Sequence, residues 1–222
     1  MFISTMQRLR EALVLVFLAI CSKAVNSRPF WWPSDTADSS GYCLSWRLAV
    51  EANNIRAWRT VPTQCSRHVE AYMTAGQYQR DLNLIVDSIC SYVDTITLSD
   101  DGFDAWILDV DDTCISNLFY YRGKRYGCEP FDPLGFRAWA LQGECGAIPD
   151  VLRLFNKLVE AGLRSGAYKG VSAITYKSEI RKQLVEEGYR IWGNVGDQWS
   201  DVQGEYAGNR TFKLPNPMYF IP

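Results

Sequence analysis

Apolar residues recur at helical spacing in the N-terminal half of the chain, and the clearest example lies between Asp81 and Ile96. The apolar positions of this stretch fall on one face of a helix: Leu82, Ile85, Val86, Ile89, Val93 and Ile96. Weaker patterns of the same period predict helices over residues 42–57 and 64–75, with a break at Pro62. We therefore expect a helical N-terminal part whose apolar stripes face a common core.

Two short apolar runs in the second half of the chain are typical of buried strands. The first is Ala105–Leu108 and the second is residues 189–195. Between them, one helix is predicted from Pro149 to Gly162 and another from Lys177 to Gly188, each ended by its glycine. Strands that alternate with helices predict an α/β fold built on a parallel sheet.

The stretch after Gly162 departs from this alternation. An α/β chain should form a strand there, but residues 163–170 contain glycine and charged residues and do not predict one. Residues 171–176 fit a strand or an extended segment. The chain therefore lacks a clear strand between two of its predicted helices.

A segment rich in aromatic residues, glycine and proline follows the first strand, over residues 114–147. It is placed to cover the end of that strand as a small cap, or else to pack as loops, and residues 131–141 are expected to hold a short helix. These patterns divide the domain into an N-terminal helical part, 25–100, and an α/β core, 101–222. We expect residues 25–42 to be extended and the C-terminal end to be irregular.

The first 24 residues have the pattern of a secretory signal peptide. Arg8 and Arg10 precede an apolar run over residues 12–20, and small and polar residues follow. The run is shorter than the ~20 residues that span a bilayer, and a membrane anchor or a buried helix is the alternative. Cleavage after Ala24 would leave a chain that is secreted or vacuolar and has no membrane attachment.

Composition and charge narrow the class of protein. The chain has 222 residues, of which 47% are hydrophobic and 14% aromatic, and these values are typical of one globular domain. Its net charge is −2. Residues 1–24 carry three basic side chains and one acidic side chain, so the remainder has a net charge of −4. No basic patch stands out in the sequence, and we expect no nucleic-acid binding.

Six of the seven cysteines remain after the predicted cleavage. An even number in an exported chain favours disulfides, although spacing cannot fix the pairing. The local candidates for bridges are the pairs Cys128–Cys145 and Cys43–Cys65. Free buried thiols are the alternative, above all for Cys90 and Cys114.

Asn209-Arg210-Thr211 is the only acceptor pattern for N-glycosylation, and the glycan would be attached to Asn209. The single histidine, His68, falls in a predicted helix. One histidine cannot form a site with several histidine ligands, and without a G-x-S-x-G pattern a Ser-His-Asp hydrolase is not indicated. We expect His68 to lie on a helix surface, so the candidate chemistry rests on carboxylates.

Three acids stand where the first strand ends: Asp109, Asp111 and Asp112. In open α/β sheets, ligands bind beyond the carboxyl ends of the strands. Carboxylates crowded at such a place repel one another unless a cation lies among them or one of them holds a proton. A simple acidic turn is the alternative. A calcium loop of the EF-hand type fits badly, since Cys114 and Tyr120 stand where that loop needs glycine and glutamate.

The second strand also runs into acids, at Asp197 and Asp201. Adjacent parallel strands would bring them together with Asp109 and Asp111, with Lys177 nearby; scattered surface acids are the alternative. Mg²⁺ prefers a few carboxylates together with phosphate oxygens and water. A carboxylate can attack phosphorus once a metal and a lysine neutralise the phosphoryl charge. A second carboxylic acid can protonate the leaving oxygen and later activate water.

Four motifs carry a family resemblance: Asp109-Val-Asp111-Asp-Thr113, Tyr176-Lys177-Ser178-Glu179, Gly196-Asp197-Gln-Trp-Ser-Asp201 and Phe212-Lys-Leu-Pro-Asn-Pro-Met-Tyr219. In these motifs the chain resembles the plant acid phosphatase and vegetative storage protein family of the haloacid dehalogenase-like superfamily. The resemblance covers nearly all of residues 42–222, and it makes residues 25–222 one acid phosphatase-like domain. It implies a Rossmann-type parallel sheet, Mg²⁺ as the cofactor and a small phosphomonoester as the substrate.

The resemblance also implies a mechanism through a phosphorylated aspartate. Asp109 would be the nucleophile and a Mg²⁺ ligand. Asp111 would be the general acid and base, and its backbone carbonyl would also bind Mg²⁺. Lys177 would hold the phosphate and Asp109. Asp197 would bind Mg²⁺, with Asp201 in support.

One element of the family pattern is missing. Members have a strand that ends in Ser or Thr, typically in a Thr-Gly-Arg triplet, between the helix ending at Gly162 and the Lys177 motif, and that hydroxyl binds the phosphoryl group. Ser172 and Thr175 lack the required strand-then-turn context, and Thr113 would instead help to fix the loop after the nucleophile. The missing unit is a strand, a helix and a strand, ~30 residues or more. We expect a sheet without those strands, with an exposed hydrophobic edge.

Two functions from different classes follow from these observations. The first is a Mg²⁺-dependent acid phosphatase whose activity is impaired by the missing segment. The second is a storage protein, or another non-catalytic protein, on the same fold; some storage members lack the nucleophile, whereas Asp109 is present here. A splice variant, a truncated paralogue or an error in gene prediction would each explain the gap. A homodimer is an open alternative to a monomer.

Overall fold

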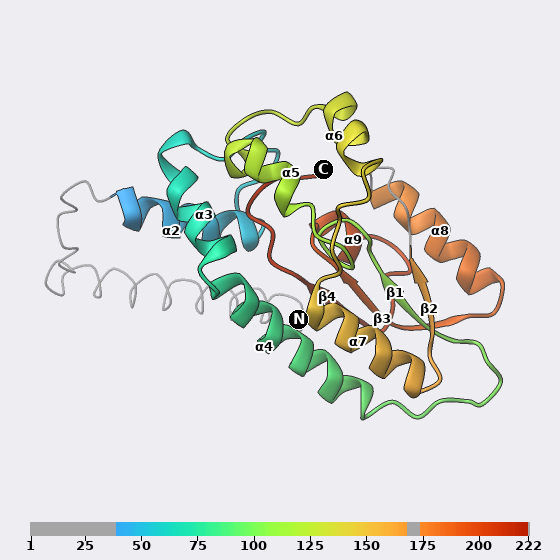
Figure 1. The fold of residues 1–222 in the computed structure, drawn as a ribbon. Coiled ribbons are helices and arrows are strands. Elements are labelled where there is room, and N and C mark those ends of the chain that lie inside the picture. Colours follow the sequence, from blue (N-terminus) through green and yellow to red (C-terminus); the bar gives the residue numbers. More distant parts are fainter. Residues whose placement is uncertain (1–38, 168–173, 222) are drawn as a thin grey trace, which may run out of the picture. The chain divides into compact units, whose positions relative to one another are not determined.

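Four parallel strands form a sheet within the described part of the chain (Figure 1). They are β1 (Asp104–Leu108), β2 (Arg164–Ala167), β3 (Arg190–Gly196) and β4 (Arg210–Lys213). Their order across the sheet is β2-β1-β3-β4, and every pair of neighbours is parallel. The α/β fold with a parallel sheet, predicted from the alternation of strands and helices, is confirmed.

The computed structural model describes residues 39–167 and 174–221, and these belong to one compact unit. The predicted signal peptide, residues 25–38 and Ser172 lie outside the described residues. A search of the described helices for one long and apolar enough to cross a membrane finds none.

Helices cover both faces of the sheet. Their bounds are α2 (Ser39–Glu51), η1 (Thr63–Cys65), α3 (Ser66–Thr74), α4 (Gln77–Val93), α5 (Leu118–Gly123), η2 (Arg125–Gly127), α6 (Pro133–Ala140), α7 (Pro149–Glu160), α8 (Ile174–Glu186) and α9 (Trp199–Val202). α4 and α7 pack together against one face (Figure 1). α8 lies on the other face, where it brings Lys177 to Asp109. The helical N-terminal part therefore includes α2, α3 and α4.

The main core lies between the sheet and the pair α4 and α7. Trp106 of β1 and Leu154 of α7 are fully buried in it. β1 is buried along its whole length, as its continuous apolar sequence predicts. Gly193 of β3 pairs with Trp106, and a β-carbon at Gly193 would lie 2.3 Å from the indole ring. Glycine at this position therefore leaves the space that the tryptophan fills.

A buried carboxylate, Asp104, fixes the start of the sheet. It accepts hydrogen bonds from Arg190 Nε at 2.8 Å, from Trp192 Nε1 at 2.7 Å and from the backbone amide of Ser99 at 2.8 Å. The bond from Arg190, above all, holds the pKa of Asp104 well below its usual range, although burial acts in the opposite direction. Asp104 thus ties β1 to β3.

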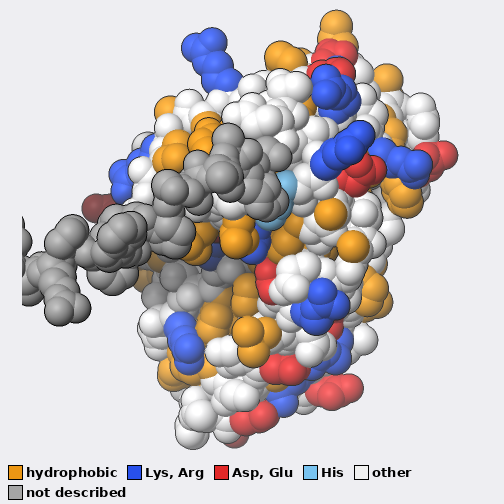
Figure 2. Space-filling model, turned by 90° about the vertical axis from the view of Figure 1, so that its left-hand side faces the viewer, with side chains coloured by type: hydrophobic (Ala, Val, Ile, Leu, Met, Phe, Trp, Pro, Cys, Tyr) orange, Lys and Arg blue, Asp and Glu red, His pale blue; other side chains and the backbone are white. Residues whose placement is uncertain are grey.

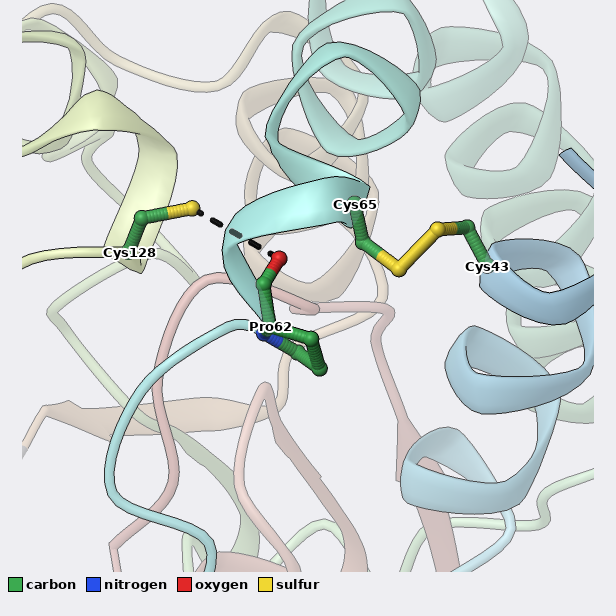
Figure 3. The surroundings of a disulfide bond; sticks show 4 residues. All are labelled: Cys43, Pro62, Cys65 and Cys128. Carbon is green, nitrogen blue, oxygen red and sulfur yellow. Dashed lines mark hydrogen bonds between the residues drawn. A yellow bond between two sulfur atoms is a disulfide. The ribbon is translucent and has the colours of Figure 1, made fainter. Parts of the chain in front are cut away.

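A second apolar cluster joins α2 and α3 to aromatic side chains from residues 120–126. A disulfide between Cys43 and Cys65 links α2 to η1 in this cluster, with 5.2 Å between the two Cα atoms (Figure 3). This is one of the two expected bridges. The other, between Cys128 and Cys145, was wrong, because both residues are free thiols.

The positions of these two cysteines explain why they do not pair. The Cys128 thiol faces the helical part and donates a weak hydrogen bond to the carbonyl of Pro62 at 3.9 Å (Figure 3). Cys145 instead lies close to Ala147, whose β-bridge to Ile115 closes the start of the inserted segment. Cys90 and Cys114 are also free thiols, which was the alternative to a disulfide for those two residues.

The segment expected to form a cap, residues 114–147, begins and ends at one place. Besides the bridge between Ile115 and Ala147, the Ser116 amide donates to the Gly146 carbonyl and the Ile148 amide donates to the Cys114 carbonyl, both at 2.9 Å. The segment contains α5, η2 and α6, and α6 is the short helix expected within residues 131–141.

Several elements differ from the prediction. Residues 164–167 form β2, although their sequence does not predict a strand, because they pair with β1 in register from Arg164 opposite Ala105 to Ala167 opposite Leu108. Tertiary pairing overrides weak local preference in such cases. Residues 174–176 begin α8 and are not a strand. β4, which pairs with β3, was not predicted, whereas the C-terminal end that follows it, residues 214–221, is irregular as expected.

The expected loss of strands beside β1 after α7 is only partly seen, because β2 follows α7 and pairs with β1. Within the described residues, β2 pairs only with β1, so its other edge has no partner strand. The chain then passes to α8 without a further strand in between, as far as the described residues show.

We predict that Gly193→Ala destabilises the protein. The added methyl group would collide with the Trp106 ring, and overpacking of this kind typically costs about 1 to 3 kcal/mol of unfolding free energy. Urea unfolding measures the effect. The matched control is Gly146→Ala, since no atom lies within 4 Å of a β-carbon there, and its unfolding free energy should change by less than about 0.5 kcal/mol. Equal effects of the two substitutions would contradict the packing described for Trp106.

Asp104→Asn should weaken the fold in a pH-dependent way. The folded-state pKa of Asp104 lies below its unfolded value, so its contribution is present above about pH 4 and is lost as the pH falls. We expect a loss of about 1 to 2 kcal/mol at pH 7 and a smaller loss at pH 3, by urea unfolding. Asp101→Asn is the control, because Asp101 binds the same Arg190 from an exposed position. A difference from the wild type that is the same at both pH values would refute the linkage.

Candidate functional site

Three aspartates meet beyond the carboxyl ends of β1 and β3. Asp109 directly follows β1, Asp197 directly follows β3, and Asp201 lies on α9. All three are buried, and one carboxylate oxygen of each lies within 4.8 Å of the others. The structure thus brings together the acids from the two strand ends.

The backbone of the two central strands sets this arrangement. The Asp109 amide donates to the Val195 carbonyl at 2.9 Å, so the nucleophile candidate stands beside the end of β3. Gly196 then leaves room for Asp201, because a β-carbon at Gly196 would lie 2.2 Å from the Asp201 Cβ. The hydroxyl of Thr113, which is fully buried, accepts a hydrogen bond from the Asp197 amide at 3.0 Å and joins the two loops.

Lys177 on α8 supplies positive charge to the cluster. Its Nζ donates to Asp109 Oδ1 at 3.1 Å and makes a second, short contact with Asp201 Oδ1. The other oxygen of Asp201 accepts the backbone amide of Gln198 at 2.7 Å. These contacts tie Asp201 to Lys177 and to the start of α9.

Arg181, one turn beyond Lys177, holds α8 in place. It is 1% exposed and donates to the backbone carbonyls of Asp201 at 2.6 Å, Gln203 at 2.7 Å and Glu205 at 3.1 Å. A buried arginine that binds backbone carbonyls leaves no motif in the sequence, so Arg181 was not predicted. It fixes the helix from which Lys177 reaches the carboxylates.

The C-terminal segment orients Asp197. Asp197 Oδ2 accepts hydrogen bonds from Asn216 Nδ2 and from Gln198 Nε2, both at 2.6 Å. Its other oxygen, Oδ1, faces the Thr113 hydroxyl at 3.4 Å. Asn216 is in turn held by the Met218 amide, which donates to its side-chain oxygen at 2.9 Å. Neither Asn216 nor Gln198 was among the predicted site residues, although both lie within the quoted motifs.

Asp111 and Asp112 diverge from the cluster. Asp111 is half-buried, and its Oδ1 accepts the side-chain amide of Asn117 at 3.1 Å. Asp112 is 2% exposed, takes the left-handed backbone conformation at φ 51°, and accepts the Asn117 amide at 2.8 Å. The three acids of the first motif therefore have three different environments.

Asp111 lines a cavity of about 380 Å³. Aromatic side chains from three parts of the chain form much of its wall: Tyr121, Phe131, Phe136, Tyr219 and Phe220. Phe131 and Phe136 belong to the segment 114–147, so that segment contributes to the walls of the cavity next to Asp111. The cavity is suited to a flat, partly apolar group.

Burial and the neighbouring charges shift the pKa values of the acids and the lysine in the cluster. Burial, then the neighbouring Asp201 and Asp197, raise the pKa of Asp109 to about 8. Burial and Asp201 raise the pKa of Asp197 to about 6. Burial would lower the pKa of Lys177, but Asp201 and Asp109 outweigh it and raise that pKa. One lysine therefore does not neutralise the buried acids.

A hard divalent cation fits this donor set. Mg²⁺ prefers carboxylate and carbonyl oxygens, and the cluster offers carboxylates with raised pKa values and a shortage of positive charge. Asp109, Asp197 and Asp201 each offer one carboxylate oxygen to such a cation. The residues present thus fit the group that the sequence led us to expect.

The hydroxyl that would bind a phosphoryl group does not stand at the end of β2. Of the four residues of β2, only Ser165 carries a hydroxyl, and it pairs with Trp106, whereas Ala167 pairs with Leu108 next to Asp109. Thr175 is exposed on α8. Within the described residues, therefore, no Ser or Thr occupies the last position of the strand beside β1.

Two other predicted residues lie away from the cluster. His68 is on α3 and half-buried, and burial, then Arg47, lower its pKa. Asn209 is exposed just before β4, where a glycan could be attached.

Comparisons with known proteins find relatives of this chain in sequence and in fold. The family model for the HAD superfamily, subfamily IIIB (Acid phosphatase), matches residues 28–166 and 163–222. Acid phosphatase 1 of Solanum lycopersicum is 36% identical over 248 residues, covering 94% of this chain and 97% of that protein. Vegetative storage protein 2 of Arabidopsis thaliana is 35% identical, covering 81% of this chain and 80% of that protein. The structure of the class C acid phosphatase from Bacillus anthracis is similar in fold, with a TM-score of 0.50 at 16% identity over 68% of this chain and 83% of that chain.

The matches also locate the gap in the chain. The family match is broken into two parts that overlap at residues 163–166. The alignment with the tomato protein extends over 248 positions, whereas 94% of this chain is about 209 residues, so about 39 positions have no counterpart here. This agrees with the expected absence of a strand, a helix and a strand after Gly162.

We predict that Mg²⁺ raises the melting temperature of the wild-type chain and that Asn216→Ala weakens this effect. Loss of the bond from Asn216 frees Asp197 to rotate, and partners of this kind are typically worth about 10- to 100-fold in metal affinity. Thermal unfolding at increasing Mg²⁺ measures the affinity without any activity assay.

Asp197→Asn should abolish the shift, whereas Asp87→Asn, a change of the same chemistry at an exposed position on α4, should leave it unchanged. A shift that survives Asp197→Asn would place the cation elsewhere.

Proposed function

Since the chain belongs to the acid phosphatases of HAD subfamily IIIB, we propose that it is a Mg²⁺-dependent hydrolase of small phosphomonoesters that acts through a phosphorylated aspartate. The observation that carries the proposal is the contact between Lys177 Nζ and Asp109 Oδ1 at 3.1 Å, in a cluster that also holds Asp197. A nucleophilic carboxylate, a counter-charge and a cation site are thus placed within one group of residues.

Asp109 is the nucleophile in this mechanism. Its carboxylate attacks the phosphorus atom, and the bond to the leaving oxygen breaks as the new bond forms. A Mg²⁺ ion held by Asp109, Asp197 and the Asp111 carbonyl would supply charge neutralisation for the phosphoryl oxygens. Lys177 contributes further positive charge next to Asp109, and its contact with Asp201 keeps it in position.

Asp111 transfers the proton. It lies two residues beyond Asp109 and lines the aromatic cavity, so the leaving group would occupy that cavity with its oxygen next to Asp111. Asp111 gives a proton to this oxygen and later takes one from the water that hydrolyses the phosphorylated Asp109. Asn117, which donates to Asp111 Oδ1 at 3.1 Å, orients the carboxyl group.

The absent hydroxyl makes the enzyme slow. A preorganised donor to the charge that develops in a transition state is commonly worth about 3 kcal/mol, or about a hundredfold in rate. We therefore propose a turnover about a hundredfold below that of a chain with the complete segment. The substrates are small phosphomonoesters, and an aromatic leaving group suits the walls of the cavity.

A storage or other non-catalytic role is the second candidate. Two observations favour it: the gap of about 39 alignment positions and the lack of a hydroxyl at the end of β2. Vegetative storage protein 2 of Arabidopsis thaliana is about as similar to this chain as the tomato phosphatase is. The retained Asp109, Lys177 and Asp197 favour the enzyme.

Export from the cytosol forms part of the proposal. The predicted signal peptide, the exposed acceptor Asn209 and the Cys43–Cys65 disulfide all suit a secreted or vacuolar chain, since disulfides persist in oxidising compartments.

We predict Mg²⁺-dependent hydrolysis of an aryl phosphate by the purified chain between pH 4 and pH 8, and its loss with a chelator. Asp109→Asn should lower kcat by about a thousandfold or more, because the amide is not a nucleophile for phosphorus. Asp87→Asn is the matched control on the surface of α4 and should keep the wild-type rate.

Near-ultraviolet circular dichroism of the same samples shows whether each variant is folded. A folded wild-type chain without turnover would refute the enzyme and favour the storage role. Full activity of Asp109→Asn would leave hydrolysis standing but refute the phosphorylated aspartate.

A further inference from the structure

A polar pocket of about 540 Å³ lies between two distant segments of the chain. One wall comes from η1 and the first turns of α3, including Ser66, Arg67 and Glu70. The other wall comes from α5 and η2 and includes Arg122 and Arg125. None of its lining residues belongs to the carboxylate cluster or to the cavity beside Asp111. It is therefore a separate site.

Positive charge dominates this pocket. Three arginines and one acid line it, and the acid, Glu70, already accepts a hydrogen bond from the Tyr126 hydroxyl at 3.1 Å. Arg67, Arg122 and Arg125 form no ion pair with any residue that the structure describes, whereas Arg153 and Arg190 each bind carboxylates. Figure 2 views the side of the molecule that carries α2 and α3, where Lys and Arg side chains lie scattered among Asp and Glu side chains. A local excess of positive charge thus stands on an otherwise acidic protein.

The walls of the pocket are held by fixed contacts. Ser66 Oγ donates to the Arg125 carbonyl at 3.4 Å, and the Val61 amide donates to the Gly127 carbonyl at 2.9 Å. The Cys43–Cys65 disulfide ends at the residue before Ser66 and anchors that wall (Figure 3). The two segments therefore keep a constant spacing, which fixes the backbone positions from which the exposed arginines extend.

The backbone of η2 is unusual at the same place. Arg125 and Tyr126 take the left-handed conformation, at φ 51° and 55°, and Gly127 follows at 91°. Residues other than glycine rarely adopt this backbone conformation. Where their surroundings hold them in it, they are often at ligand sites. Here Tyr126, which is 6% exposed, is fixed by Glu70 and the second apolar cluster. The conformation directs Arg125 to the pocket.

We propose that this pocket binds a small, soluble phosphate-type anion with two or more negative charges. A guanidinium group presents paired N–H donors that match the oxygens of such an anion, and three of them can surround it. Thr63, which also lines the pocket, offers a hydroxyl donor. A monovalent carboxylate would use fewer of these donors and should bind more weakly.

The test is calorimetric titration of pyrophosphate into the full chain kept free of metal by dialysis, with acetate at equal ionic strength as the reference. We expect saturable binding of pyrophosphate and none of acetate. Arg67→Gln or Arg122→Gln should weaken binding about tenfold or more, because each removes a charged donor from a regular helix position. Arg137→Gln, an exposed arginine on α6, is the matched control and should change the affinity by less than about twofold.

Lys177→Gln separates this pocket from the carboxylate cluster. If Lys177→Gln abolishes binding while Arg67→Gln leaves it intact, the anion sits in the cluster and the proposal is wrong. The proposal is equally wrong if no saturable binding occurs, or if all variants bind alike. Melting temperatures show that each variant is folded. Because hydrolysis is not measured, the outcome is independent of the proposed phosphatase activity.

Discussion

The repulsion between three buried carboxylates is the constraint on which the site depends. Asp109, Asp197 and Asp201 come together because β1 and β3 are neighbours and end at the same edge of the sheet. Such a cluster is tolerated only where charge and hydrogen bonds offset the loss of water. Lys177 supplies the charge, and its helix is in turn fixed by Arg181. Much of the surrounding structure therefore acts to hold negative groups that would otherwise move apart.

Sequence reasoning located the acids but not the residues that hold them. Asp109 and Asp197 follow apolar runs that read as buried strands, so their meeting could be inferred from the topology of parallel sheets. Arg181 and Asn216 act through contacts with backbone and side chains far away in the sequence, and such contacts leave no local pattern. β2 was missed for the same reason, since its Gly-containing sequence forms a strand only because β1 lies beside it. The basic pocket escaped notice because its arginines come from two separate segments.

The missing segment does not leave β1 without a neighbouring strand, although its size would suggest so. The family match breaks after α7, yet β1 still has a strand on each side, because residues 164–167 fill the place beside it. The support of Asp109 is thus retained. What changes is the chemistry at the end of that neighbouring strand, where Ala167 stands next to Leu108 and offers no hydroxyl. The gap thus leaves the carboxylate cluster whole, while the last position of β2 holds alanine.

Residues 214–221 hold Asp197 by hydrogen bonds. These bonds link the proposed metal centre to local opening of this C-terminal segment. Asn216 binds Asp197, and the Ile221 amide donates to the Gln198 side chain, which itself binds Asp197. Residues 214–218 are buried, so this segment opens only by local unfolding, and each opening would release one oxygen of the aspartate. Linkage between cation binding and opening of the segment is reciprocal. If opening lowers the affinity of Asp197 for a cation, a bound cation makes opening rarer by the same factor. Deuterium uptake at the Ile221 amide would therefore register the occupancy of a centre with which that residue has no direct contact.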